Sequence, residues 1–253
     1  MGLKLKIMKK IITALFIASV FFTACTTVDT ADVSKITYFP IITVSGANPY
    51  FVPQGTAYVD PGAVAKAGTV VIPHTTAATG KYRGSTTMDT NKVDEYAVTY
   101  SATNSDGFVG SGSRKVIVYK NGNLVNSIEG LYTCTISRNG VTPSAAYRNI
   151  KYIYIWKNTN GTYEISDAFG GWYEYGRALG LGYITPKGTI EAVDIATNTF
   201  LFPGNPLTNT GFGGTAKITD LTVNAATKTL VLTCTWVAPT AYTFIATLTQ
   251  VQP

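Results

Sequence analysis

The feature that most restricts the fold of this chain is the alternation of large and small side chains with a period of two. Residues 96–102 read Tyr-Ala-Val-Thr-Tyr-Ser-Ala, so Tyr96, Val98 and Tyr100 share one face of an extended strand. Asn104–Gly107 contains Asp-Gly, a strong signal for a hairpin turn, and Lys115–Tyr119 supplies the returning strand. Regular strands of this length predict a β-sandwich in the N-terminal half.

The C-terminal half continues this pattern, and none of its segments has the periodicity of a helix. The expected strands, separated by glycine-containing turns, are Gly130–Ser137, Asn149–Lys157, Thr162–Ser166, Trp172–Arg177, Leu181–Ile184, Thr189–Val193, Thr199–Phe202, Ala216–Val223, Thr229–Val237 and Tyr242–Gln250. An antiparallel meander of this size predicts an up-and-down β-barrel or a two-sheet sandwich. The whole chain is therefore expected to be all-β.

The formal net charge of +6 comes mainly from the N-terminal segment. Residues 1–24 hold four of the 20 basic residues and no acidic one, which leaves 16 bases against 14 acids and a net charge of about +2. No basic run follows that segment, so we expect no nucleic-acid partner. Charged residues make up only 13% of the chain, whereas about a quarter is usual.

The N-terminal segment has the organisation of a secretory signal. Lys4–Lys10 is basic, and Ile11–Phe22 is apolar but shorter than the roughly 20 residues that a membrane-spanning helix needs. The next residues, Thr-Ala-Cys, complete a motif that resembles a bacterial lipobox, in which the cysteine becomes the lipidated N-terminus. We expect lipidation at Cys25. Gram-negative lipoproteins retained in the inner membrane usually have Asp at the next position, so Thr26 favours the outer membrane.

Four segments in order, Val33–Pro40, Tyr58–Ala63, Tyr96–Phe108 and Arg114–Tyr119, resemble the immunoglobulin-like domain of Bacteroidetes surface lipoproteins, of the type classed as domain of unknown function 5012. Asp94-Glu95 stands where those domains usually have a Pro-Gly turn, so the local turn type is left open. The C-terminal half resembles the lipocalin-like modules that follow such domains. The resemblance implies a lipoprotein anchored in the outer membrane and facing the cell exterior.

These observations divide the chain into five segments. Residues 1–24 are the expected lipoprotein signal peptide, and residues 25–37 are a polar, flexible tether. Residues 38–120 form the immunoglobulin-like domain, and residues 121–126 form a linker. Residues 127–253 form the antiparallel β-barrel domain.

Two further cysteines lie on expected strands of the second domain. Cys134 and Cys234 each share a strand face with large apolar residues, so both are expected to point inward. In a closed barrel the first and last strands become neighbours, which allows a disulfide if the Cα atoms come within about 7 Å. Two buried free thiols fit the same pattern, and the sequence leaves both readings open.

The sequence offers little catalytic chemistry. His74 is the single histidine, which is too few for a zinc site, and no Gly-x-Ser-x-Gly motif occurs. The glycine-rich Gly211–Gly214 precedes an expected strand and not a helix, so it fails the structural test for dinucleotide binding. We therefore expect no enzyme activity, no metal and no cofactor.

One segment of the second domain concentrates aromatic side chains beside glycines. A strand over this segment would place Trp172 and Glu174 on one face and Tyr173, Tyr175 and Arg177 on the other. Exposed aromatic rings can stack on sugars, while Glu and Arg side chains bond hydroxyl groups. These five residues are the expected glycan-binding site.

The expected function is therefore non-catalytic: glycan binding, or an accessory role in an outer-membrane polysaccharide uptake complex. Three alternatives stay open. The first is a structural or protein-interaction module, which would show a contiguous exposed apolar patch. The second is a glycoside hydrolase using Glu164, Asp167 or Glu174, which needs two carboxyls facing one cleft. The third is a barrel with a cavity for a small apolar ligand.

Overall fold

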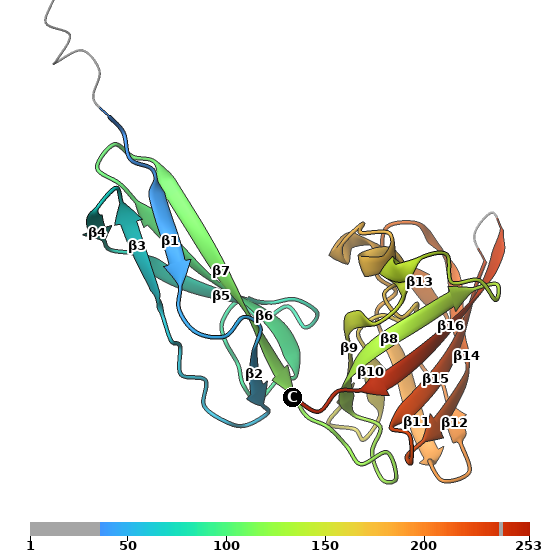
Figure 1. The fold of residues 1–253 in the computed structure, drawn as a ribbon. Coiled ribbons are helices and arrows are strands. Elements are labelled where there is room, and N and C mark those ends of the chain that lie inside the picture. The colour runs from blue at the N-terminus through green and yellow to red at the C-terminus, as the bar shows by residue number, and fades with distance from the viewer. Residues whose placement is uncertain (1–35, 238–239) are drawn as a thin grey trace, which may run out of the picture. The chain divides into compact units, whose positions relative to one another are not determined.

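The computed structural model describes residues 36–237 and 240–253 (Figure 1). The fold is all-β, as predicted, with an immunoglobulin-like sandwich followed by a curled antiparallel sheet. Residues 39–253 form one unit. The signal peptide, Cys25 and all but the end of the predicted tether lie outside the described residues. Among the residues described, no helix is long and apolar enough to cross a membrane.

The N-terminal domain consists of two packed sheets. The first has the order β1-β3-β4 and the second β2-β7-β6-β5. Their bounds are β1 Pro40–Val44, β2 Tyr50–Pro53, β3 Ala63–Ala67, β4 Val70–Ile72, β5 Thr75–Gly80, β6 Asp94–Thr103 and β7 Val109–Tyr119. The predicted hairpin is present as β6 and β7, which pair in antiparallel register with Tyr96 opposite Val116.

The alternation that predicted this hairpin is the core pattern of the sandwich. Tyr96, Val98 and Tyr100 are all buried, and they pack with Val116 and Val118 of the partner strand. Residues at every second position of an antiparallel strand share one face, so one face of β6 and β7 supplies these five residues of the sandwich core.

The C-terminal domain is a single nine-stranded sheet that curls into a half-barrel, with the order β12-β11-β10-β9-β8-β16-β15-β14-β13. Its strands are β8 Gly130–Arg138, β9 Ile150–Lys157, β10 Tyr163–Ile165, β11 Gly188–Asp194, β12 Thr199–Leu201, β13 Leu207–Asn209, β14 Gly213–Asn224, β15 Thr229–Val237 and β16 Ala241–Gln250. Short helical turns lie between strands: η3 Ala145–Tyr147, η4 Trp172–Gly176 and η5 Leu181–Tyr183. The first and last strands, β8 and β16, pair as predicted.

The interior of the half-barrel is filled with side chains. Phe169 and Trp172 are buried there, and the Phe169 ring stacks on Phe244 of β16 with centroids 4.3 Å apart. Tyr132 and Trp236 belong to the same cluster. The alternative of a hollow barrel for a small apolar ligand therefore finds no support in this packing.

Two predicted strands are wrong. Trp172–Arg177 contains the π-helical turn η4, and Leu181–Ile184 contains the 3₁₀ turn η5. Gly170 and Gly171 both have positive φ, 62° and 84°, a conformation that glycine adopts without strain. They turn the chain sharply after Phe169, so the aromatic segment that follows cannot continue as a strand.

Of the two possibilities left open for Cys134 and Cys234, the structure shows buried free thiols and no disulfide between them. Cys134 on β8 lies opposite Leu248 of β16, which lies opposite Leu230 of β15. Cys234 is four residues further along β15. Two strand spacings of about 4.8 Å and four residues of about 3.4 Å each separate the two positions far beyond the reach of a disulfide.

Candidate functional site

The π-helical turn η4 carries the five predicted glycan-binding residues, but it does not present them on one surface. Trp172 is 1% exposed and packs against the Tyr147 ring at 4.2 Å. Glu174 is buried as well, whereas Arg177 is exposed. The turn distributes the remaining side chains to two different regions of the protein.

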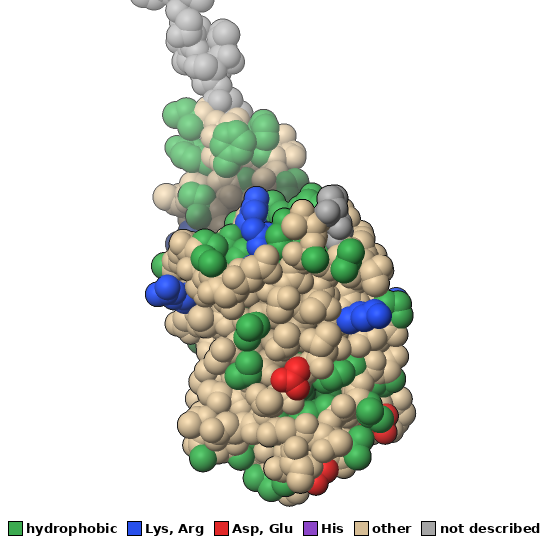
Figure 2. Space-filling view, turned by 90° about the vertical axis from the view of Figure 1, so that its right-hand side faces the viewer, with side chains coloured by type: hydrophobic (Ala, Val, Ile, Leu, Met, Phe, Trp, Pro, Cys, Tyr) green, Lys and Arg blue, Asp and Glu red, His purple; other side chains and the backbone are tan. Residues whose placement is uncertain are grey.

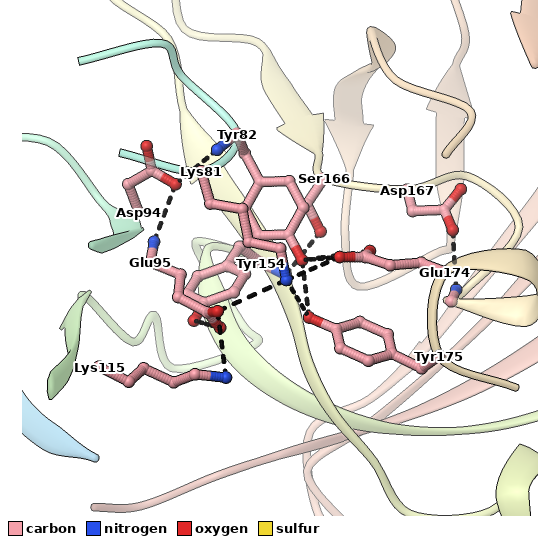
Figure 3. A network of polar contacts seen from close by, with 11 residues as sticks. Lys81, Tyr82, Asp94, Glu95, Lys115, Tyr154, Ser166, Asp167, Glu174 and Tyr175 are labelled. Atoms are coloured by element: carbon pink, nitrogen blue, oxygen red, sulfur yellow. Dashed lines mark hydrogen bonds and ion pairs between the residues drawn. The ribbon is translucent and has the colours of Figure 1, made fainter. Parts of the chain in front are cut away.

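The first region is a partly buried polar junction between the two domains (Figure 3). It is formed by Lys81, Tyr82, Glu95, Lys115, Tyr154, Glu174 and Tyr175. The Lys81 ammonium lies 2.7 Å from a carboxylate oxygen of Glu174. The Tyr82 hydroxyl donates to Glu174 at 3.0 Å, and the hydroxyls of Tyr82 and Tyr175 are 2.8 Å apart. Glu174 and Tyr175 are therefore bonded to the first domain.

A second carboxylate completes the junction. Glu95 at the start of β6 pairs with Lys115 at 3.0 Å and with Lys81 at 3.4 Å, and it accepts a bond from the Tyr154 hydroxyl at 3.3 Å. Burial raises the pKa of Tyr154 well above its ordinary value, and the negative charge of Glu95 acts in the same direction. Each charged group in the junction thus has a partner of opposite sign within the protein.

Asp94 positions the loop that carries Lys81 and Tyr82. Its carboxylate accepts the backbone N–H groups of Tyr82 and Arg83 at 2.9 and 3.0 Å. The Asp94-Glu95 pair, whose turn type the sequence left open, therefore begins a strand, with Asp94 fixing the neighbouring loop and Glu95 entering the junction.

Asp167 lies behind η4 and is fully buried. Its carboxylate accepts the N–H groups of Phe169, Gly171 and Thr185 at 2.9 to 3.0 Å, which holds the turn that precedes η4. Burial raises the pKa of Asp167 to about 7 despite these bonds, and the charge of Glu174 adds to the shift. The role visible for Asp167 is the capping of backbone donors.

The three carboxylates proposed for hydrolysis do not converge on one open cleft. Glu164 on β10 is partly exposed and lines a separate cleft with Asn158 and Asn160. Asp167 has no exposed surface, and Glu174 is paired with Lys81 in the junction. Glycoside hydrolysis by two carboxyls that flank a substrate is not favoured by this arrangement.

The second region is a hollow of about 270 Å³ in the C-terminal domain, here called the aromatic pocket. Its lining consists of four aromatic side chains, two arginines and a threonine: Tyr173, Phe212, Trp236, Tyr242, Arg138, Arg177 and Thr240. They come from η4, from the ends of β8, β15 and β16, and from the segment before β14. Two of the predicted residues, Tyr173 and Arg177, line this pocket.

The aromatic rings of the pocket support one another. Trp236 and Tyr242 stack with centroids 5.8 Å apart and an interplanar angle of 29°. Tyr173 packs edge-on against Phe212 at 5.0 Å and against Trp236 at 5.8 Å. Trp236 also donates its indole N–H to the Gly213 carbonyl at 3.0 Å. The wall is therefore preformed, as binding sites for small ligands usually are.

The two arginines differ in how they are held. Arg138 lies between two rings, with its guanidinium carbon 4.9 Å from the Trp172 centroid and 4.4 Å from the Tyr242 centroid. Arg177 is exposed at the C-terminal end of η4. Burial raises the pKa of Tyr173, whereas a hydrogen bond with the Arg138 side chain and the positive charges of Arg138 and Arg177 oppose that shift.

Sequence reasoning missed most of the pocket. Arg138, Phe212, Trp236 and Tyr242 come from segments far from η4 in the chain. Trp236 and Tyr242 face each other across the pairing of β15 and β16, a register that a strand prediction alone does not give. Their position near the expected β15–β16 turn was the one signal available in the sequence.

The face of the molecule drawn in Figure 2 carries few charged side chains. On the face drawn in Figure 2, the Lys and Arg side chains are separated from one another, and the hydrophobic side chains form small groups and no continuous patch. Among the described residues, no group of three or more His, Cys, Asp and Glu side chains is placed to hold a metal ion. His74 instead packs edge-on against Tyr100 at 5.7 Å.

Comparison with known proteins gives results for both halves of the chain. A family model for the Ig-like domain of bacterial surface proteins matches residues 42–118, and a model described as "-like, C-terminal domain" matches residues 121–250. The crystal structure of the lipoprotein BT2262 from Bacteroides thetaiotaomicron is similar, with 23% identity and a TM-score of 0.56, covering 83% of this chain and 99% of that chain. No curated protein matches. The predicted resemblance to surface lipoproteins with an Ig-like domain is confirmed.

Proposed function

This chain belongs to the family whose C-terminal domain matches residues 121–250, and from that premise we propose that it is a non-catalytic surface lipoprotein that binds a glycan. The proposed site is the aromatic pocket. The immunoglobulin-like domain serves as the spacer that carries this pocket away from the membrane.

The observation that carries the proposal is the convergence of aromatic rings and polar groups on one open hollow. Phe212 lies at the edge of the pocket and is 50% exposed, and Tyr173 and Trp236 form the pocket wall. Aromatic rings offer flat apolar faces to the C–H side of a sugar, while Thr240 and the arginines offer hydroxyl and N–H groups. A hollow of about 270 Å³ holds one or two sugar rings, which suits a shallow binding site.

A glycan array with the purified protein tests the proposal. Two variants remove the edge of the pocket, Phe212→Ala and Tyr242→Ala, and Phe108→Ala removes an exposed ring of the first domain as the control. We expect the two pocket variants to lose about tenfold or more in affinity, since stacking on an aromatic ring contributes about 1–3 kcal/mol in other ligand classes. An array without any bound glycan, or equal affinities for all variants, would overturn the proposal.

The proposal is non-catalytic because the pocket lining contains no carboxylate, thiol or histidine. Carboxylates, thiols and imidazoles most often supply general acid–base or nucleophilic chemistry, and the tyrosine and threonine hydroxyls of the pocket have no such base beside them in the lining. Oligosaccharides bound on the array are therefore expected to be recovered intact. Chromatography of the bound sugars after long incubation measures this directly.

We also propose the outer membrane as the location, with Cys25 carrying the lipid and the two domains facing the cell exterior. A partner in this arrangement is an outer-membrane polysaccharide uptake complex, to which the protein would deliver the glycan. Incorporation of labelled palmitate, lost in Cys25→Ser, tests the anchor. Protease treatment of intact cells tests the orientation, since an outward-facing protein is degraded and a periplasmic one is protected.

A second candidate function, a protein-interaction module, is favoured by one surface of the first domain. The outward face of the sheet β1-β3-β4 carries Ile41, Val64 and Val71, which are 69%, 43% and 64% exposed. Exposed apolar side chains gathered on one sheet face are typical of interaction surfaces. Crosslinking in intact cells that is lost in Ile41→Lys and kept in Phe212→Ala would support this function in place of glycan binding.

A further inference from the structure

We propose that the ligand of the aromatic pocket is an acidic saccharide, a sugar that carries a carboxylate or sulfate group. The inference rests on the proposed glycan binding and specifies the chemistry of the ligand. It follows from the charges around the pocket, which are positive and have no acidic counterpart within the described protein.

The pocket lining holds two arginines and no acidic residue. None of the ion pairs among residues 36–237 and 240–253 includes Arg138 or Arg177. Two cations on one small hollow repel each other, and an anion between them removes that repulsion. The arrangement is therefore electrostatically complementary to a negative group.

Cations with a structural role elsewhere in this protein are paired with carboxylates. Lys81, Lys115 and the buried Arg114 all lie within 3.4 Å of a carboxylate oxygen. By contrast, Arg138 is held in place by rings, not by a carboxylate. A cation that is positioned and left without an acid is available to an anion from outside.

The geometry of Arg138 suits this role. The rings of Trp172 and Tyr242 contact the guanidinium at 4.9 and 4.4 Å, which restrains the side chain. The N–H groups of a guanidinium point outward in its own plane, where they can form two parallel bonds to a carboxylate or sulfate. Burial raises the pKa of Tyr173, so its hydroxyl stays protonated at neutral pH and can donate a further bond.

The aromatic wall restricts the ligand to an anion that belongs to a sugar. Phe212, Trp236 and Tyr242 provide apolar ring surface that an inorganic anion would leave uncovered. A saccharide ring can cover these faces while its carboxylate or sulfate reaches Arg138 or Arg177. Both sources of charge share this chemistry, and the experiment below separates them.

The test compares ligands that differ only in charge. Titration calorimetry measures the affinity for trigalacturonate, whose charge is carboxylate alone, and for its methyl ester, and also for a κ-carrageenan oligosaccharide, whose charge is sulfate alone, and for its desulfated form. We expect at least one acidic member to bind about tenfold or more tightly than its neutral counterpart. Added salt should lower the affinity for that acidic ligand and leave the affinity for the neutral ligand nearly unchanged, because salt screens interactions between exposed charges. The pair that shows the difference identifies carboxylate or sulfate as the recognised group.

The variant Arg177→Met removes a charge and keeps much of the apolar stem. It should abolish most of the preference for the acidic ligand, whereas Lys66→Met, on the outward face of the first domain, should not. Equal affinity for the charged and neutral members of both pairs would overturn the inference, and the proposed function would stand if any neutral glycan binds. If no glycan of either kind binds, the proposed function fails together with the inference.

Discussion

The two sides of η4 use charge in opposite ways. On one side, Glu174 and Tyr175 enter the polar junction, where Lys81 lies 2.7 Å from the Glu174 carboxylate. On the other, Tyr173 and Arg177 line the aromatic pocket, whose two arginines have no ion pair within the described residues. Five consecutive residues, 173–177, thus connect a region whose charges are paired with a region whose charges are not.

The difference separates residues that hold the fold from residues that are available for binding. Buried charges are retained only when they are paired and hydrogen-bonded, because removal from water costs several kcal/mol per ion. The junction meets this condition, so its carboxylates are explained by structure alone. In the aromatic pocket Arg138 is only partly buried and Arg177 is exposed, so solvent reaches both cations and the fold requires no acidic partner there. The proposed anionic ligand would bind these two side chains.

The largest effect is expected when the junction loses its carboxylate. Glu174→Ala removes the closer of the two ionic partners of Lys81 and an acceptor of the Tyr82 hydroxyl, while the cation stays mostly buried. Breaking such a pair on one side should lower the free energy of unfolding by about 3 kcal/mol. Chemical denaturation measures the change.

The matched control for that variant is Glu191→Ala on β11, where the side chain is exposed. It should change the free energy of unfolding by no more than about 0.5 kcal/mol. Equal stability of the two variants would mean that the junction is not the paired structural region described above, and the contrast with the pocket would be lost.

The next effect concerns the pH dependence of stability. Burial raises the pKa of Asp167 to about 7, so between pH 4 and 7 the folded protein binds more protons at this site than the unfolded chain. The stability contribution of Asp167 is therefore fully present at about pH 4 and falls as the pH rises towards 7. One proton corresponds to a slope of at most about 1.4 kcal/mol per pH unit.

Denaturation of the protein and of Asp167→Asn across this range measures the difference in slope, because the other carboxylates titrate in both. The decline should be absent in the variant. The charge of Glu174 contributes to the raised pKa, so Glu174→Gln should move the decline to lower pH. Parallel pH profiles for all three proteins would show that Asp167 does not titrate in this range.

A smaller loss of stability is expected when Gly170→Ala places a methyl group next to the start of η4. The Cβ of Gly170→Ala would lie 2.8 Å from the Ala246 Cβ and 3.0 Å from the Cys134 sulfur, and the residue has a φ of +62°. Crowding and backbone strain should reduce stability by about 2 kcal/mol in a thermal or chemical unfolding experiment. Gly182→Ala, whose Cβ would meet open space, should be nearly neutral.

The fold was largely predictable, because the β pattern is local. The alternation at Tyr96, Val98 and Tyr100 identified the central hairpin of the first domain, and most strands of the second were found within a few residues. The strand predicted over Trp172–Arg177 was wrong. Aromatic residues favour strands on average, but here the turn at Gly170-Gly171 and packing inside the half-barrel determine the local structure.

The candidate site was only partly predictable for a different reason. Tyr173 and Arg177 were found because they are close in sequence within an aromatic segment. Their pocket neighbours are on distant segments of the chain, and those on β8, β15 and β16 meet only when these strands pair in one register. The assignment of Glu174 to the junction depends in addition on Lys81, a residue of the other domain.

The smallest effect on stability should come from the pocket itself. Arg177→Ala removes an exposed side chain without an ion pair, so the free energy of unfolding should change by no more than about 0.5 kcal/mol. Arg138→Ala also loses the contacts with two rings and should be destabilised by about 1 kcal/mol. Chemical denaturation of these two variants and of Glu174→Ala measures the three changes in the free energy of unfolding and ranks them. A large loss of stability in Arg177→Ala would mean that this arginine has a structural partner in the folded protein. The distinction between a junction with paired charges and a pocket with unpaired charges would then be wrong for the arginine proposed to bind the ligand.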